Sequence, residues 1–229
     1  MSRMLLGAGG SNRAFSPGDV SSLWLWLDAP SLGLANDAAV SAWPNKIGGV
    51  GFIQSTAGSR PTYKTGIQNG KAVVRFDGTA DYMRSSAVRS LTQPATIFVV
   101  AQRTGNYTAY SVVFSQATEA MALGFDVSAD EWYAYTNPAL IDQVAADDAF
   151  HYLMALENGA GSIMRADGTQ KAAALDAGNV SGDTIVIGAT SGAAAPLAGD
   201  IGELIVYEAA LSAAQILQVE NYLKSKWGL

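Results

Sequence analysis

Short apolar runs separated by turn residues repeat along most of the chain. Leu23–Leu27 and Thr96–Ala101 are apolar on both faces, and Ala72–Phe76 follows the turn pair Asn69-Gly70. Further β-prone runs cover residues 82–84, 110–115, 121–127, 131–135, 151–156, 162–165, 184–187 and 201–207. Because these runs recur every ~8–15 residues with turn signals between them, they predict an all-β, antiparallel β-sandwich.

One α-helix is predicted at the C-terminus. Ser212 and Gln215 form a capping box, and Leu211 with Ile216 forms a hydrophobic staple. Gly228 is suited to end the helix. One face carries the apolar residues at spacings of three and four, namely Ile216, Val219, Leu223 and Trp227. We therefore expect the helix to lie against the outside of the sandwich, with Trp227 partly buried.

The sequence predicts one domain over residues 19–229, preceded by an arm over residues 1–18. Two Ala/Gly-rich stretches, 172–178 and 192–199, lack periodicity and are expected to be loops. The arm is predicted to be flexible, or to dock onto a partner and become ordered there. Its docking residues are predicted to be Arg3, Leu5, Leu6 and Phe15.

Composition narrows the candidate partners. Of 229 residues, 49% are hydrophobic and 15% are charged, and the net charge is −6. An acidic surface repels phosphate groups, so we expect no nucleic-acid partner. No run approaches the ~20 apolar residues of a spanning helix, and the N-terminus does not read as a secretion signal, so no membrane insertion is expected. Absence of cysteine excludes disulfides and thiol catalysis.

Residue patterns for catalysis are missing. The one histidine, His151, lies in an apolar strand run and is expected to be structural. A glucan hydrolase on a sandwich would carry Glu-x-Asp-x-x-Glu along one strand, and the strand acids Glu131, Glu157 and Glu203 miss this spacing. We predict that the chain is not an enzyme and needs no cofactor.

Two binding sites are conceivable from the residues. Asp77 and Asp81 flank a turn and could hold calcium, although Asp-Gly is also ordinary turn chemistry. A sugar-stacking platform is suggested by aromatic residues in or beside turns, and the alternative is that they serve core packing or an oligomer interface. The platform residues are Trp132, Tyr133, Tyr135 and Tyr107.

The order of motifs resembles the laminin G-like/concanavalin A-like lectin-glucanase jelly-roll domains of phage virion and bacterial surface proteins. The resemblance covers about residues 20–229, and its motifs are Leu23–Ala29, Val40–Asn45, Arg60–Tyr63, Asn69–Gly78, Gly199–Tyr207 and the C-terminal helix. It implies a jelly roll that binds sugars or proteins or serves as a structural module, and it transfers no catalytic residue. One departure is Gly202, where many members carry an acidic residue.

These observations favour a non-catalytic structural or decoration protein of a tailed bacteriophage, in the capsid, tail or fibre. Such a protein is assembled in the host cytoplasm and later exposed in the virion, which suits a chain without cysteine. Its expected partners are other virion proteins, copies of itself in a homo-oligomer and a host surface glycan. The alternative is a lectin-like adhesion module on a bacterial cell surface, and a glucan-active hydrolase ranks third.

Overall fold

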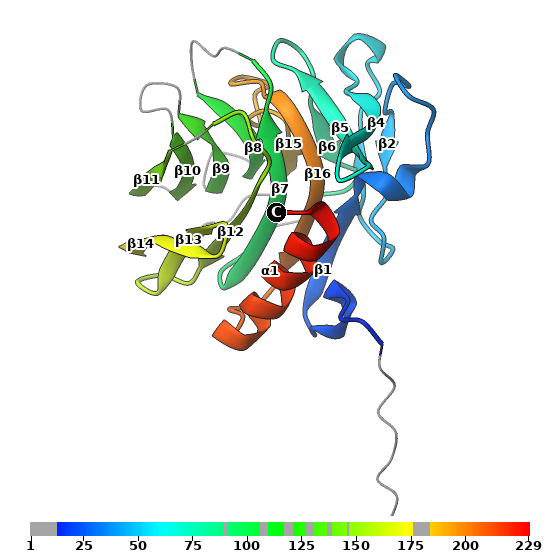
Figure 1. The fold of residues 1–229 in the computed structure, drawn as a ribbon. Coiled ribbons are helices and arrows are strands. Elements are labelled where there is room, and N and C mark those ends of the chain that lie inside the picture. The colour runs from blue at the N-terminus through cyan, green and yellow to red at the C-terminus, as the bar shows by residue number, and fades with distance from the viewer. Residues whose placement is uncertain are drawn as a thin grey trace, which may run out of the picture.

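Two antiparallel sheets form the body of the protein (Figure 1). The computed structural model describes residues 13–88, 91–105, 110–116, 121–126, 131–136, 139–145, 147–175 and 184–229. The predicted all-β sandwich with one C-terminal helix is confirmed. Three short 3-10 helices accompany it, at Pro17–Asp19, Ala29–Leu32 and Ala57–Ser59.

Sheet A has the strand order β14-β13-β12-β7-β16-β5-β4, with β1 pairing onto β16. Its strands are β1 (Leu23–Asp28), β4 (Thr62–Gln68), β5 (Lys71–Asp77), β7 (Ala95–Arg103), β12 (His151–Glu157), β13 (Ser162–Ala166), β14 (Thr169–Leu175) and β16 (Ala198–Tyr207).

Sheet B has the order β11-β10-β9-β8-β15-β6-β3-β2. Its strands are β2 (Ala42–Trp43), β3 (Phe52–Ile53), β6 (Met83–Ser85), β8 (Ser111–Gln116), β9 (Met121–Asp126), β10 (Glu131–Thr136), β11 (Ala139–Ala145) and β15 (Ile185–Ile187).

Two hairpin turns in sheet A follow directly from the sequence. Asn69 and Gly70 connect β4 to β5 with φ of 48° and 69°, and Asp167 and Gly168 connect β13 to β14 with φ of 48° and 78°. Positive φ at both central residues is typical of the turn whose twist matches that of paired strands, and Asn-Gly and Asp-Gly tolerate it best.

Side chains from both sheets form the main core between them. β5 shows the alternation, since Val74 and Phe76 join this core while Val73 faces the other side of sheet A. On that outer side a second apolar cluster joins the sheet to helix α1 (Ala213–Trp227), which lies beside β1, β16 and β7 (Figure 1).

Helix α1 has the predicted ends. Ser212 accepts a hydrogen bond from the Gln215 N–H, and Gly228 adopts the left-handed conformation with φ of 71°. Leu211 and Ile216 are both buried in the second cluster. Trp227, expected to be partly buried, is 0% exposed.

Three features differ from the prediction or extend it. The stretch 172–178 was expected to be a loop, but β14 continues to Leu175, because edge pairing with β13 supplies what local periodicity lacks. The strands β4 and β11 were not predicted, because their residues carry no clear alternation of apolar and polar positions.

Of the predicted arm, residues 13–18 are described and pack on the body: Tyr207 donates a hydrogen bond to the Pro17 carbonyl at 3.0 Å. Over the described part of the chain, no helix has the length and apolarity that crossing a bilayer requires.

Candidate functional site

A polar cleft of about 380 Å³ lies where several strands of sheet A end on the same side. Val74 and Phe76 point into the core, so the alternation of β5 turns Arg75 and Asp77 outward. The register sets Ala198 of β16 opposite Asp77. We call this hollow the Asp81 cleft, and its polar lining consists of Thr62, Lys64, Arg75, Asp77, Asp81 and Thr104.

Asp77 and Asp81, the predicted pair, are brought together by the turn after β5. Asp77 Oδ1 accepts hydrogen bonds from the N–H groups of Thr79, Ala80 and Asp81 at 2.8, 2.9 and 3.1 Å. In return, the Asp77 N–H donates to Asp81 Oδ2 at 3.1 Å. The two carboxylates therefore hold the turn closed from opposite ends.

The two carboxyl groups differ in acidity. Burial raises the pKa of Asp81, the neighbouring charge of Asp77 adds to this, and together they bring it to about 6. Burial alone would also raise the pKa of Asp77, but its hydrogen bonds from Thr79, Ala80 and Asp81 outweigh that effect and lower it to about 2. Asp77 is thus a fixed anion, whereas Asp81 titrates near neutral pH.

Calcium at Asp77 and Asp81 stays a prediction. Oxygen atoms of Asp77 already accept four hydrogen bonds within the turn. The described residues contain no group of three or more His, Cys, Asp or Glu side chains placed to hold a metal. The contacts that are present are those of a turn.

Both cations of the Asp81 cleft are paired. Arg75 binds Asp200 in a bidentate ion pair, with Nε–Oδ1 and Nη2–Oδ2 distances of 2.7 Å each. Asp200 is fully buried behind it. Lys64 forms an ion pair with Asp37. The cleft therefore presents polar groups without an uncompensated positive charge.

The aromatic platform is contradicted where the structure describes it. Trp132 is 0% exposed and packs edge-to-face on Phe125, with ring centroids 5.0 Å apart. Tyr133 is 4% exposed and belongs to a small cluster with Val112 and Ala122. A sugar cannot stack on buried rings, so the alternative of core packing holds for these two. Tyr107 and the Tyr135 side chain lie outside the described residues.

His151 is a structural residue, as expected. Its Nδ1 lies 2.6 Å from Asp167 Oδ2, and its Nε2 lies 2.9 Å from Asp147 Oδ1. The hydrogen bond to Asp167 is the main cause that raises the pKa of His151, and the bond to Asp147 adds to it. With both ring nitrogens engaged, the imidazole is not placed to serve as a base for a serine nucleophile.

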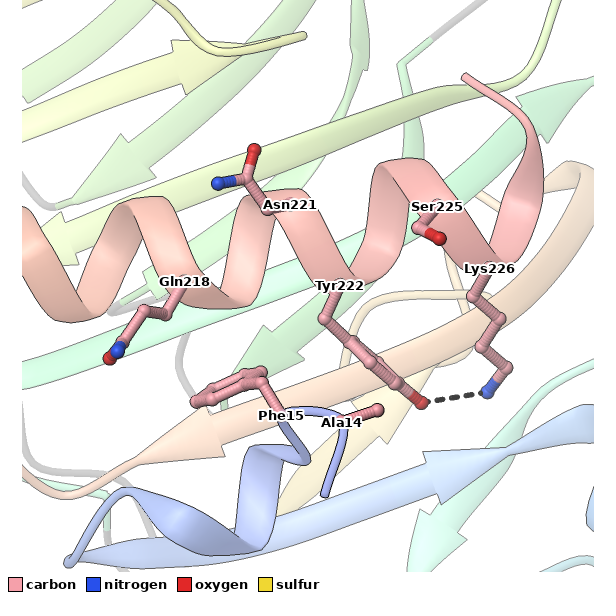
Figure 2. Close-up of a pocket in the computed structure, with 7 residues that line it drawn as sticks. All are labelled: Ala14, Phe15, Gln218, Asn221, Tyr222, Ser225 and Lys226. Carbon is pink, nitrogen blue, oxygen red and sulfur yellow. Dashed lines mark hydrogen bonds between the residues drawn. The ribbon is translucent and has the colours of Figure 1, made fainter. Parts of the chain in front are cut away.

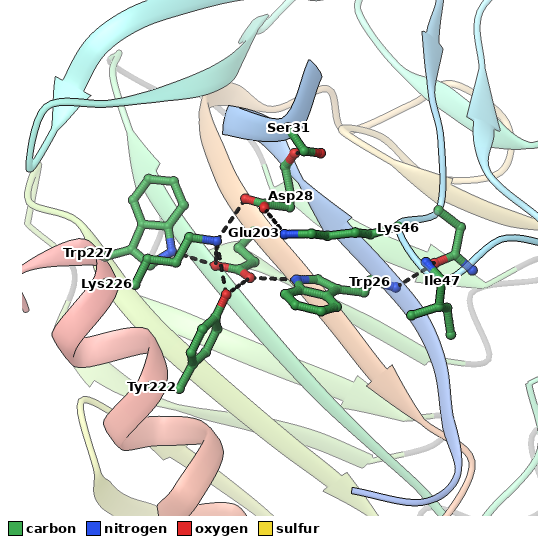
Figure 3. A network of polar contacts seen from close by, with 10 residues as sticks. Trp26, Asp28, Ser31, Lys46, Ile47, Glu203, Tyr222, Lys226 and Trp227 are labelled. Carbon is green, nitrogen blue, oxygen red and sulfur yellow. Dashed lines mark hydrogen bonds and ion pairs between the residues drawn. The ribbon is translucent and has the colours of Figure 1, made fainter. Parts of the chain in front are cut away.

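A buried polar network that the sequence did not suggest joins helix α1 to sheet A (Figure 3). Glu203 of β16 is 0% exposed. Its Oε1 accepts from Trp26 Nε1 at 2.6 Å and from the Tyr222 hydroxyl at 2.8 Å. Its Oε2 accepts from Trp227 Nε1 at 2.7 Å and pairs with Lys226 Nζ at 2.8 Å. Four donors saturate this carboxylate, so its role is to fix the helix.

A second groove, of about 480 Å³, runs between α1 and the chain at Ala14 and Phe15 (Figure 2). Phe15, predicted to dock onto a partner, packs edge-to-face on Tyr222 with ring centroids 6.4 Å apart. Arg3, Leu5 and Leu6, the other predicted docking residues, lie outside the described residues. The described end of the arm therefore packs on helix α1 of the same chain.

One carboxyl oxygen of a buried acid has no hydrogen-bond partner among the described residues. Glu157, at the end of β12, is 1% exposed, and no donor reaches its Oε2. Burial raises the pKa of Glu157 from its ordinary 4.5 to about 7. Between these two values the folded protein keeps a proton that the unfolded chain releases, so the free energy of unfolding falls as the pH rises.

Replacing Glu157 with glutamine should remove this pH dependence. We expect E157Q to match the unaltered protein at pH 4.5 and to exceed its free energy of unfolding by about 2–3 kcal/mol at pH 8. Urea denaturation at both pH values measures the difference, and comparing the two proteins cancels the titration of all other groups. An advantage that is equal at both pH values would contradict the account.

Comparison with known proteins assigns the chain to a family. A model of the concanavalin A-like lectin/glucanases superfamily matches residues 77–217, more than half of the chain. The chain belongs to this superfamily. No curated protein sequence matches it.

Solved structures agree with the concanavalin A-like fold. The sialidase of Trypanosoma rangeli, solved with the inhibitor DANA, aligns with a TM-score of 0.61 at 11% identity over 88% of this chain. This chain spans only 33% of that sialidase. Domain 4 of AbnA, an extracellular arabinanase from Geobacillus stearothermophilus solved with arabinotriose, aligns with a TM-score of 0.61 at 12% identity. There the match covers 87% of this chain and 98% of the domain. At these identities the likeness shows the fold alone.

Many concanavalin A-like relatives carry an acid at the position of Gly202, and in this chain the packing of Trp227 explains why a glycine stands there. A Cβ atom at Gly202 would lie 2.6 Å from the Trp227 ring. Trp227 is fully buried and tied to Glu203, so the ring has little room to move. The glycine therefore lets the helix approach the sheet closely.

Proposed function

We propose that this concanavalin A-like chain is a non-catalytic recognition module that binds a carbohydrate in the Asp81 cleft. The observation that carries the proposal is the cleft itself: about 380 Å³, lined by two carboxylates, a guanidinium, an ammonium and two hydroxyl groups. Such a volume lies at the lower end of the ~300–1,000 Å³ typical of ligand pockets. Carbohydrates are recognised through convergent polar groups of this kind.

A structural relative supports carbohydrate as the ligand class. The arabinanase domain that this chain matches almost from end to end was solved with arabinotriose. That complex shows that a domain of this fold accommodates an oligosaccharide. It does not determine which sugar this chain binds, so the proposal names the class only.

The absence of catalysis is proposed on geometry. The pKa values of Asp77 and Asp81 lie far apart, near 2 and 6, as in acid/base pairs. However, glycoside hydrolysis needs carboxyl groups on opposite sides of the scissile bond, and these two belong to one turn and bind each other's backbone. The hydrogen bonds that Asp77 accepts also weaken it as a nucleophile or base.

We propose further that the module works as a structural or decoration protein of a virion. Support comes from the anchored base of the arm, where Phe15 packs on Tyr222 and Arg13 pairs with Asp19. A segment held in this way could join the module rigidly to a neighbouring protein. Mass spectrometry of purified particles tests the idea, and the absence of the chain from them would contradict it.

Calorimetric titration with neutral and acidic oligosaccharides, arabino-oligosaccharides among them, tests carbohydrate binding. We expect saturable binding of at least one sugar and no release of reducing ends on prolonged incubation. Failure of the whole panel to bind would refute the recognition proposal. Reducing ends appearing in proportion to protein concentration would refute the non-catalytic proposal.

A further inference from the structure

We propose that the Asp81 cleft selects an uncharged saccharide, whose hydroxyl group donates a hydrogen bond to Asp81 Oδ1, and rejects acidic saccharides. This inference rests on the proposed function, because it specifies which carbohydrates the same cleft takes. Its basis is the hydrogen-bonding state of Asp81 and the charge balance around it.

Asp81 offers an acceptor that the protein leaves unused. The residue is 7% exposed, so most of its water has been removed. Its Oδ2 accepts the Asp77 N–H, whereas no donor among the described residues reaches its Oδ1. This oxygen is not enclosed by the protein but stays open to the cleft, so a hydrogen-bond donor can reach it there. A sugar hydroxyl seated in the cleft supplies the missing donor.

The charge balance disfavours an anionic sugar. Two cations line the cleft, Lys64 and Arg75, and each is neutralised by a carboxylate, Asp37 and Asp200 respectively. With Asp77 and Asp81 added, four acids surround two bases. A uronic or sialic acid would approach two cations that are already neutralised and two further carboxyl groups, so the local charge disfavours its binding.

Hydroxyl groups at the edge complete a site for a neutral sugar. Thr104 is exposed, and Thr62 is half-buried on the neighbouring strand β4. Each hydroxyl can donate or accept, as sugar hydroxyls can. The cleft therefore combines one strong acceptor with adaptable partners, which suits a ligand that both donates and accepts but carries no charge.

The pH profile of binding gives a test that needs no variant. Because the Asp81 carboxyl has a pKa of about 6, it is ionised at pH 8 and largely protonated at pH 5. A hydrogen bond to an ionised acceptor is stronger than one to a neutral acceptor, so affinity for a neutral oligosaccharide should rise about fivefold from pH 5 to pH 8. A flat profile would overturn the role of Asp81.

Calorimetry on the full chain, with matched neutral and uronic oligosaccharides, completes the test. We expect neutral sugars to bind at least tenfold more tightly, and D81N to lose about fivefold at pH 8 together with the pH dependence. The control E208Q removes one acid at the opposite end of β16 and should bind as the unaltered chain does. Tighter binding of acidic sugars overturns this inference but leaves carbohydrate recognition standing, whereas no binding of any sugar refutes the proposed function.

Discussion

Replacing Glu203 with glutamine should lower the free energy of unfolding by about 3–5 kcal/mol. Glu203 is fully buried and accepts from two indole N–H groups, a tyrosine hydroxyl and an ammonium. Glutamine has one acceptor oxygen, and its NH2 group would face donors. With the amide oxygen in the place of Oε1, the Trp227 Nε1–H is left unpaired, and Lys226 loses one of its two carboxylate partners, Asp28 being the other.

Urea denaturation at pH 7 measures this loss, with E208Q as the control. Glu208 lies on the exposed surface just after β16, so the same chemical change there should alter stability by no more than about 0.5 kcal/mol. Equal stability of E203Q and E208Q would show that the network contributes little. If E203Q loses its helical circular-dichroism signal before the sheets unfold, that result would also support a role of the network, because Glu203 joins α1 to the sandwich.

Replacing Trp132 with alanine should cost about 3–5 kcal/mol of stability, through the cavity that the indole leaves. Trp132 is fully buried in the main core, and its ring lies 5.0 Å from Phe125 and 6.1 Å from His151, measured between centroids. No described residue forms a hydrogen bond with its Nε1, so the expected loss arises from packing.

Thermal and urea denaturation of W132A, with L217A as the control, distinguish packing from sugar stacking. Leu217 is 54% exposed on α1, and its truncation should change stability by about 0.5 kcal/mol or less. Folded W132A, at a temperature well below its midpoint, should keep its sugar affinity. A stable W132A that no longer binds sugar would contradict the assignment of Trp132 to the core and restore the stacking platform.

Elements with local signals were predictable. The capping box at Ser212 and the turn at Asn69-Gly70 depend on a few neighbouring residues, and each forms as expected. The strand β14 was missed because its stability comes from pairing with β13, which local periodicity does not reveal.

Features that depend on distant residues were not predictable. Trp26 and Glu203 are 177 positions apart, and no local pattern connects them. The aromatic residues of β10 do not reveal which faces of the strand are covered, and here Trp132 and Tyr133 are both buried. For Asp77 and Asp81 the turn sequence predicted proximity, whereas the cleft around them depends on β4, β7 and β16 arriving at the same place.

The most direct test of the account is a nuclear magnetic resonance titration of the labelled chain with a neutral oligosaccharide at pH 8. The account predicts saturable shifts of the backbone amides of Asp77–Asp81, Thr62 and Thr104, which line one end of sheet A. The backbone amide resonances of β10 and of α1 should not shift. Shifts confined to β10 or to the groove at Phe15, or no shifts with any sugar, would contradict it.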